Sequence, residues 1–308
     1  MKYKLGSLIG KGSDGEVYDL LDRENIAKKV IKFIQPSIYG IRNYLEPYIM
    51  LHLDHQHIMK AENIEVDTND ILKIVQIKAD NDLYKNLNYK KINIATKLKY
   101  MRQLTEAVYY LQQHNIVHGD IKPHNILLVN DNIKLSDFSL SRLILKEPCQ
   151  CQKKSYTLAY RPPEIKENKI YLKSDIWALA CTLYEIYYNK VYFNISKEFK
   201  TYHIKSNKIN NTFDNLINSM LSIDVNERYS IEKVISFFNI SHSEIKYKLH
   251  PKLEFEDFSN QSIYLDKCYY KDNIKKINKK YADIEKKIIN NYNFLIFENF
   301  PEYDKNKN

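Results

Sequence analysis

One short stretch of the chain, from His118 to Asn125, holds three side chains that could do chemistry together. It reads His-Gly-Asp-Ile-Lys-Pro-His-Asn, and the apolar run Ile-Leu-Leu-Val that follows predicts a short strand over 126–129. Asp120 could accept the proton of a hydroxyl group, and Lys122 could neutralise a phosphate. Asn125 offers an uncharged oxygen that suits a hard cation such as Mg²⁺. Transfer of a phosphoryl group needs these three functions at one place.

A second carboxylate, Asp137, follows one hairpin later in the sequence Ser136-Asp-Phe-Ser139. Together with Asn125 it would supply the protein ligands of a metal ion that bridges to phosphate oxygens. We expect that ion to be Mg²⁺, with Mn²⁺ as the alternative.

Three glycines, Gly10, Gly12 and Gly15, lie between two segments that alternate like strands. Glycine lets a backbone turn tightly and approach phosphate oxygens without interference from a Cβ atom. The same spacing also occurs in dinucleotide-binding folds, where a helix follows, and in ordinary flexible hairpins. Because residues 16–21 are strand-like here, we expect a glycine-rich hairpin over a nucleotide.

A candidate strand with three lysines follows, reading Ile26-Ala-Lys-Lys-Val-Ile-Lys32. One lysine is expected to neutralise nucleotide phosphates. The pattern Ile-Ala-x-Lys selects Lys29, which would share a strand face with Ala27. Lys32 is the competitor, since hairpin length does not decide between them, and the remaining lysines would be surface charges. Glu46 is the expected partner of the chosen lysine, on a helix at about 41–53 that contains a proline.

Taken in order, these motifs resemble those of the eukaryotic-type protein kinases over residues 1 to about 240. The resemblance implies an α+β, two-lobed fold, with a β-rich N-lobe at 1–78, a hinge at 79–82 and a helical C-lobe at 83–240. The main helix of the C-lobe is expected from a stripe that begins with Ile94 and Leu98, and further helices are expected at 174–188, 212–222 and 230–238. The implied substrates are ATP and proteins, with Asp120 and Lys122 catalytic and with Asn125 and Asp137 as metal ligands. The expected ATP-binding residues are Ile9, Gly10, Gly12, Gly15, Val17, Ala27, Lys29, Glu46, Gln76, Ile77, Ala79 and Asp82.

Four of those residues describe the adenine and ribose end of the expected site. Gln76 would limit the depth behind adenine, and Ile77 and Ala79 would offer backbone hydrogen bonds to the base. Asp82 would accept from the ribose, or would simply be an exposed aspartate at the junction of the lobes.

The segment Thr157-Leu-Ala-Tyr-Arg-Pro-Pro-Glu164 resembles the substrate-positioning loop of serine/threonine kinases, and it is most similar to that of the cyclin-dependent group. Thr157 is expected near Asp120 and Lys122. The residues before Glu46 lack the recognition sequence of that group, so a cyclin-type partner is not supported. The resemblance further implies that Glu164 pairs with Arg228 and that Asp175 binds backbone groups of the catalytic loop.

Two residues depart from the family pattern. Gly119 replaces the arginine that usually docks a phosphorylated activation loop, so we expect activity without loop phosphorylation. Ser139 replaces a glycine and removes no catalytic group. The alternative is a pseudokinase scaffold that binds partners without phosphotransfer.

Composition adds weaker expectations. The net charge of +9 is spread over a lysine-rich chain, which indicates a solvated surface more than a nucleic-acid partner. No apolar run is long enough to span a bilayer. Of the four cysteines, two are close together and two are isolated, which indicates neither a disulfide framework nor a zinc site and suits a reducing, cytoplasmic compartment. Abundant Asn, Lys, Ile and Tyr fit an AT-rich genome, such as that of a large DNA virus.

Residues 241–308 fall outside the resemblance and are expected to form a helical extension. Its apolar stripe would pack against the helical lobe or bind an unknown partner. The stripe consists of Ile274, Ile277, Tyr281, Ile284 and Ile288.

Overall fold

The computed structural model describes residues 3–12, 15–34, 42–66, 71–144, 146–150, 156–193 and 212–241. The chain divides into two compact units. The first contains the described residues of Met1–Asp54 and Lys60–Lys78, and the second contains those of His55–Met59 and Ala79–Lys248. Residues 242–308 of the expected helical extension and two of the cysteines, Cys151 and Cys268, lie outside the described residues.

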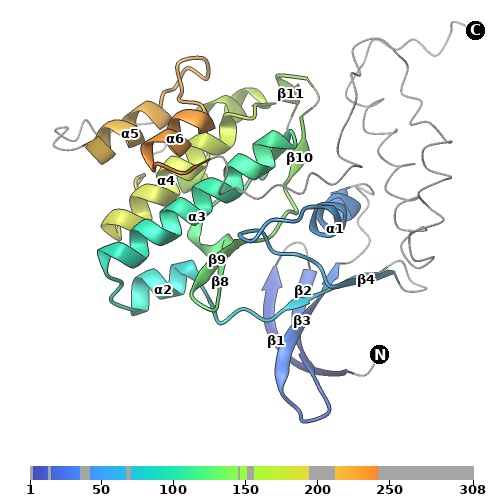
Figure 1. Cartoon of the computed structure of the whole chain (residues 1–308). Coiled ribbons are helices and arrows are strands. Elements are labelled where there is room, and N and C mark those ends of the chain that lie inside the picture. The colour runs from blue at the N-terminus through green and yellow to red at the C-terminus, as the bar shows by residue number, and fades with distance from the viewer. Residues whose placement is uncertain are drawn as a thin grey trace, which may run out of the picture. The chain divides into compact units, whose positions relative to one another are not determined.

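The first unit is an antiparallel sheet of five strands with one helix (Figure 1). The strands run in the order β1-β2-β3-β5-β4. They are β1 (Lys4–Gly12), β2 (Gly15–Leu21), β3 (Ala27–Ile34), β4 (Asn63–Val66) and β5 (Leu72–Ile77), and the helix is α1 (Arg42–His52). Pro47 lies inside α1, and the helix continues past it to His52.

Alternation along the strands gives this sheet two different faces. Leu20, Ile31 and Val75 form a small buried cluster on one face, and Tyr18 and Phe33 pack against it. The rings of Tyr18 and Phe33 meet edge to face with their centroids 5.6 Å apart. Residues one position along each strand therefore belong to the opposite face.

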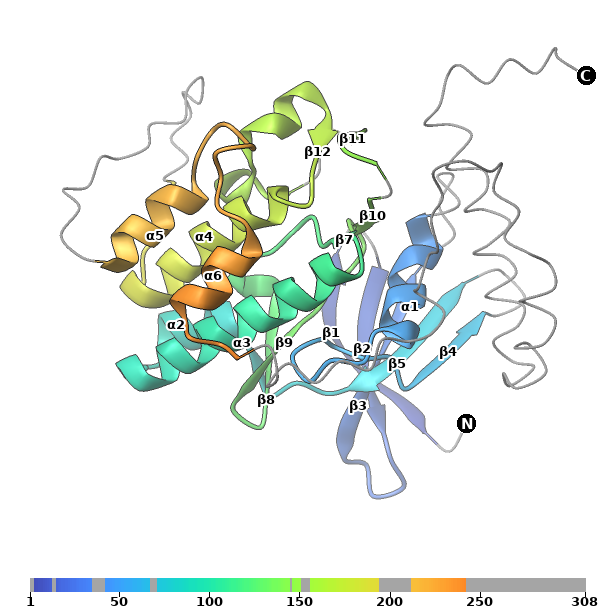
Figure 2. The same ribbon diagram turned by 45° about the horizontal axis from the view of Figure 1, so that its top comes forward.

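The second unit is mainly helical and also carries three small sheets (Figure 2). Its helices are α2 (Leu83–Tyr89), α3 (Ile94–Gln113), α4 (Ser174–Tyr188), α5 (Thr212–Met220) and α6 (Ile231–Phe237). Its strands are β6 (Asn81–Asp82), β7 (Ile116–Val117), β8 (Ile126–Val129), β9 (Asn132–Leu135), β10 (Arg142–Leu143), β11 (Cys149–Gln150) and β12 (Lys169–Ile170).

The long helix α3 is the centre of the second unit, where it packs against both α4 and α6. The side chain of Asn93 caps its N-terminus by accepting from the backbone N–H of Thr96 at 2.8 Å. The middle of its predicted apolar stripe is buried, as Met101 and Leu104 show. Ile94 is 54% exposed and Leu98 is 40% exposed, so the expected stripe does not reach the core in the first turns.

The β-rich first unit and the helical second unit confirm the predicted α+β fold class. The elements that were not predicted include β4, the short helix α2 and several two-residue strands of the second unit. Within the described part of the chain, no helix is both long and apolar enough to cross a lipid bilayer.

Candidate active site

The glycine-rich hairpin joins β1 to β2, with Gly12 opposite Gly15 in the register. Gly15 has φ +149°, and a Cβ added there would lie 2.1 Å from the carbonyl oxygen of Phe33. No side chain fits at that position, because the neighbouring strand is too close. A Cβ at Gly12 would meet nothing within 4 Å, which leaves its backbone open to a ligand.

Lys32 of β3 and Glu46 of α1 form an ion pair in the first unit. The Nζ atom of Lys32 donates to both carboxylate oxygens of Glu46, at 2.8 and 2.9 Å. Both side chains are largely buried, with 13% of the lysine and 4% of the glutamate side chain exposed. A buried charge needs such a partner, because burial alone disfavours the charged form.

The prediction that Glu46 pairs with Lys29 is therefore wrong. Lys29 forms its ion pair with Glu62, and this hydrogen bond raises the pKa of the lysine. Its ammonium group also lies 5.4 Å from the ring centroid of Tyr3. The physical reason is strand alternation, since residues three apart on β3 point to opposite faces of the sheet.

The register shows which other residues share the face of Lys32. Val17 is opposite Lys32 on β2, and Val30 is opposite Gln76 on β5. Directly opposed residues of antiparallel strands project to the same side, so Val17, Val30, Lys32 and Gln76 form one surface. Val30 lies two residues before Lys32 and so stands beside the paired lysine, the place that was predicted for Ala27 beside Lys29. Ala27 is opposite Leu21, beyond an irregularity in the register, and its contact with ATP stays a prediction.

Ile77 and Ala79 follow this surface along the chain. Ile77 is the last residue of β5, and Ala79 precedes β6. Asp82 caps helix α2 by accepting from the backbone N–H of Lys85 at 2.8 Å, and its other oxygen lies 3.2 Å from the lysine Nζ. Asp82 thus has a structural role as a helix cap. Its contact with ribose stays a prediction, and so do the nucleotide-binding roles of Ile9, Ile77 and Ala79.

Asp120 in the second unit accepts hydrogen bonds from three neighbouring residues. Oδ1 accepts from the backbone N–H and the hydroxyl of Thr157, at 2.9 and 2.8 Å. Oδ2 accepts from Lys122 Nζ at 2.5 Å and from Asn125 Nδ2 at 3.0 Å. Lys122 also donates to the Thr157 hydroxyl at 2.6 Å. The predicted proximity of Asp120, Lys122 and Thr157 is therefore confirmed.

The same catalytic loop brings Asp137 next to Asn125. Ser136 donates to the carbonyl oxygen of Asn125 through its backbone N–H and its hydroxyl, both at 2.9 Å. Asp137 follows directly, in the left-handed region with φ +64°. Phe138 is fully buried and its ring centroid lies 5.0 Å from that of His118. The hydrophobic anchor of Phe138 fixes the backbone that carries Asp137.

These two residues fit a bound Mg²⁺ by their chemistry. The amide nitrogen of Asn125 is engaged with Asp120, so its oxygen is the atom left for a cation. No group of three or more His, Cys, Asp or Glu side chains in the described ranges would hold a metal unaided. Mg²⁺ commonly takes one or two protein ligands and completes its shell with phosphates and water, which suits Asn125 and Asp137.

A scaffold of buried polar groups holds the catalytic loop. Asp175 of α4 is fully buried and accepts from the backbone N–H groups of His118 and Gly119, at 2.6 and 3.1 Å. Burial raises the pKa of Asp175, and these hydrogen bonds oppose the rise. His118 is also fully buried, and its Nε2 contacts the carbonyl oxygen of Ser136 at 3.0 Å. The predicted scaffold roles of Asp175 and His118 are confirmed.

The predicted pair of Glu164 and Arg228 is also present. Nη1 and Nη2 of Arg228 donate to the two carboxylate oxygens of Glu164, at 2.7 and 2.8 Å. Ser174 adds a hydrogen bond to Glu164 at 2.7 Å, a partner that no sequence pattern indicated. A planar guanidinium matches a carboxylate in this two-bonded arrangement.

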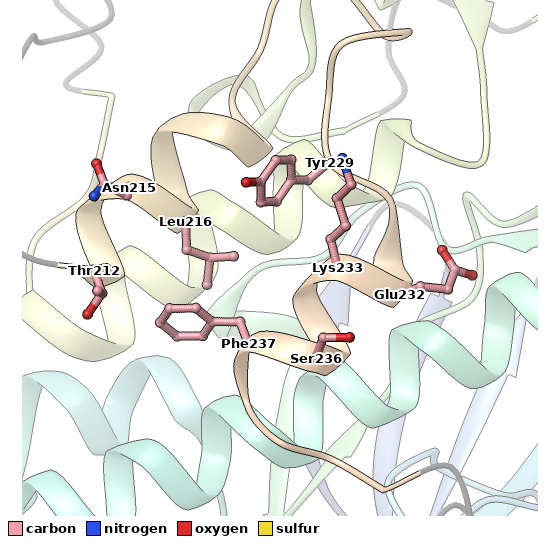
Figure 3. Close-up of a pocket in the computed structure, with 8 residues that line it drawn as sticks. All are labelled: Thr212, Asn215, Leu216, Tyr229, Glu232, Lys233, Ser236 and Phe237. Carbon is pink, nitrogen blue, oxygen red and sulfur yellow. The ribbon is translucent and has the colours of Figure 1, made fainter.

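A pocket of about 570 Å³ lies elsewhere in the second unit, at α5, α6 and the turn before α6 (Figure 3). Leu216 and Phe237 lie side by side in it. None of the residues predicted for catalysis or nucleotide binding lines this pocket.

Comparison with known proteins agrees with this geometry. Residues 3–237 match the family model described as Protein kinase domain. Aurora kinase C of Mus musculus is 29% identical over 251 residues, which cover 76% of this chain and 89% of the relative. A probable cell division protein kinase of Encephalitozoon cuniculi is 34% identical over 194 residues, 60% of this chain and 71% of the relative. Serine/threonine-protein kinase mph1 of Schizosaccharomyces pombe is 33% identical over 213 residues, 62% of this chain and 31% of the relative.

The chain belongs to the protein kinase domain family. Together with its relatives, this match makes it a protein serine/threonine kinase.

Proposed function

We propose that the chain transfers the γ-phosphate of ATP to serine or threonine hydroxyls of protein substrates, with Asp120 as the catalytic base. The observation that carries this proposal is the set of hydrogen bonds around the Asp120 carboxylate. Donors from Lys122, Asn125 and Thr157 hold the carboxylate in one orientation. A base that is fixed before the substrate arrives loses little freedom in the reaction.

Lys122 is proposed to neutralise charge on the transferring phosphoryl group. Its ammonium group has three donors, of which two are used by Asp120 and Thr157. The remaining donor is available to a phosphate oxygen. Asn125 and Asp137 are proposed to hold Mg²⁺, which would neutralise phosphate charge when bound.

Lys32, rather than Lys29, is proposed to contact the nucleotide phosphates, with Glu46 holding it in place. The Lys32 ammonium group is largely buried and paired, and it lies on the strand face that carries Val17 and Gln76. These features favour Lys32 over Lys29 as the lysine that binds the phosphates. Val17 and Val30 are proposed to cover the adenine ring from this face.

The pseudokinase alternative draws little support from the two unusual residues. Gly119 has φ +82°, and a Cβ there would lie 2.6 Å from the carbonyl oxygen of Leu140. Ser139 is not among the described residues with positive φ, so a serine fits its backbone. Neither residue removes a group that touches phosphate, metal or the attacking hydroxyl.

The experiment is a transfer assay with the purified full-length chain, γ-labelled ATP, Mg²⁺ and a generic basic protein. We expect label on serine or threonine of the acceptor, identified by phosphoamino-acid analysis. ATP binding without any transfer, in Mg²⁺ and in Mn²⁺, would support the scaffold alternative. Label confined to tyrosine would contradict the proposed acceptor.

A further inference from the structure

Tyr156 is a buried aromatic residue directly before Thr157, and from here on it is counted as the first residue of the positioning loop. It is 1% exposed, and its backbone has φ +62°. A bulky side chain is uncommon in this left-handed region, so surrounding contacts must hold it there. Neither the motifs nor the proposed chemistry explains why a tyrosine stands here.

Three groups of Tyr156 are held by different parts of the second unit. Its hydroxyl donates to Asp175 Oδ1 at 2.8 Å. Its backbone N–H donates to the carbonyl oxygen of Gly119 at 3.0 Å. Its own carbonyl oxygen accepts from Nε and Nη2 of Arg161, at 3.1 and 2.7 Å.

Asp175 therefore joins the two segments that must meet at the catalytic centre. Its carboxylate accepts from the backbone of His118 and Gly119 in the catalytic loop and from Tyr156 in the positioning loop. Burial raises the pKa of Tyr156 well above its usual value, so its hydroxyl stays a proton donor. The bond is within the protein interior, where an unpaired acceptor would be costly.

The residue after this anchor is the one that contacts the catalytic base. Thr157 donates to Asp120 through both its backbone N–H and its hydroxyl. A shift of Tyr156 would move Thr157 directly, because one peptide bond connects them and that bond is planar and stiff.

We infer that Tyr156 is a positioning residue, a buried anchor that holds Thr157 against Asp120 without a phosphate on the positioning loop. Gly119 has no side chain with which to bind such a phosphate, and the Tyr156–Asp175 contact ties the loop to the same place in the structure. The effect on rate rests on the proposed function, whereas the effect on loop order does not.

The test compares Tyr156→Phe with Tyr100→Phe in the full-length chain. Tyr100 is also 1% exposed, and its hydroxyl also donates to a carboxylate, that of Asp131 at 2.6 Å. Hydrogen–deuterium exchange is measured on peptides covering 156–161. We expect exchange there to rise roughly tenfold in Tyr156→Phe, as loss of one buried hydrogen bond allows, and to stay unchanged in Tyr100→Phe.

Steady-state kinetics supplies the second readout. In Tyr156→Phe we expect kcat to fall roughly tenfold while the KM for ATP changes less than about twofold. Phosphatase-treated wild type, shown by mass spectrometry to carry no phosphate at 145–157, should keep its kcat. Arg161→Gln, which removes donors to the Tyr156 carbonyl at a half-buried site, should raise exchange at 156–161 as well.

Three results would overturn the inference. Wild-type exchange and kcat in Tyr156→Phe would show that the anchor is not needed, and equal changes in Tyr100→Phe would show a general loss of stability. Loss of activity on phosphatase treatment would show that the loop needs its phosphate. If the wild type transfers no phosphate at all, the proposed function fails, and the exchange comparison still decides whether Tyr156 orders the loop.

Discussion

Lys32 and Glu46 form a two-bonded ion pair, with the lysine Nζ 2.8 and 2.9 Å from the carboxylate oxygens. Lys29, three residues earlier on the same strand, pairs with Glu62 on the opposite side of the sheet. The two lysines have the same chemistry and nearly the same place in the sequence, so comparing them isolates the effect of the strand face.

Lys32→Met should abolish most phosphotransfer, because it removes the largely buried ammonium group that Glu46 holds and that is proposed to contact the nucleotide phosphates. Removing one preorganised charge or donor commonly costs about 100-fold or more in kcat. Initial rates at several ATP concentrations would measure the loss.

Lys29→Met is the matched control, and we expect it to keep kcat within about threefold of wild type, as for a surface ion pair. If Lys29→Met is the inactive variant and Lys32→Met the active one, the assignment made from the Glu46 contact is wrong.

Arg228→Ala should destabilise the second unit strongly. The Arg228 side chain is fully buried and Glu164 is 8% exposed, so the mutation leaves a buried carboxylate without its cation. Breaking such a pair typically costs about 3–5 kcal/mol. Denaturant unfolding would measure the change, with Lys169→Ala as the control.

Lys169 is paired with Glu167 in an exposed position, at 2.9 Å. We expect Lys169→Ala to unfold at the same denaturant concentration as wild type. An Arg228→Ala variant as stable as Lys169→Ala would show that the buried pair contributes nothing.

Stability should fall when the pH drops below about 6.5, the usual pKa of histidine, in part because of His114. This side chain is 3% exposed, and its Nδ1 contacts the carbonyl oxygen of Tyr110 at 2.7 Å. Burial lowers the pKa of His114 in the folded state. The unfolded chain therefore binds the proton more readily, and the stability present above pH 6.5 is lost as the pH falls toward the folded pKa.

His114→Asn keeps an N–H group for the Tyr110 carbonyl and cannot be protonated. Melting temperatures of both proteins at pH 7.5 and 5.5 test the point. The melting temperature of the variant should fall less between pH 7.5 and 5.5 than that of wild type. An equal fall in both proteins would show that His114 does not cause the loss of stability in acid.

Residues that act within one short segment could be predicted from the sequence. Asp120, Lys122 and Asn125 lie within six positions, so their order and spacing nearly determine how they meet. Thr157 was placed near them by resemblance, and its hydrogen bonds to Asp120 agree. The ion pair between Arg228 and Glu164 was likewise predicted from the resemblance, and it is present in the structure.

The choice between Lys29 and Lys32 could not be made from the sequence, because it depends on a partner from another element. Only the register of β3 with β2 and β5, and the position of Glu46 on α1, distinguish the two faces. Helix α2 did leave a signal, since Leu83 and Leu87 are four residues apart and both buried behind the cap Asp82. No sequence pattern predicted the role of Tyr156, because its partner Asp175 is distant in the sequence and binds it only in the folded chain.

The central claim is that Asp120 is the base of a phosphotransfer reaction, and the most direct test is Asp120→Asn. The amide keeps nearly the same shape and can still accept from Thr157, so the melting temperature and the affinity for ATP should stay close to wild type. The rate of transfer to a protein substrate should fall by about 10²–10⁴, the usual contribution of a general base. Transfer at the wild-type rate by a folded Asp120→Asn protein would contradict the account.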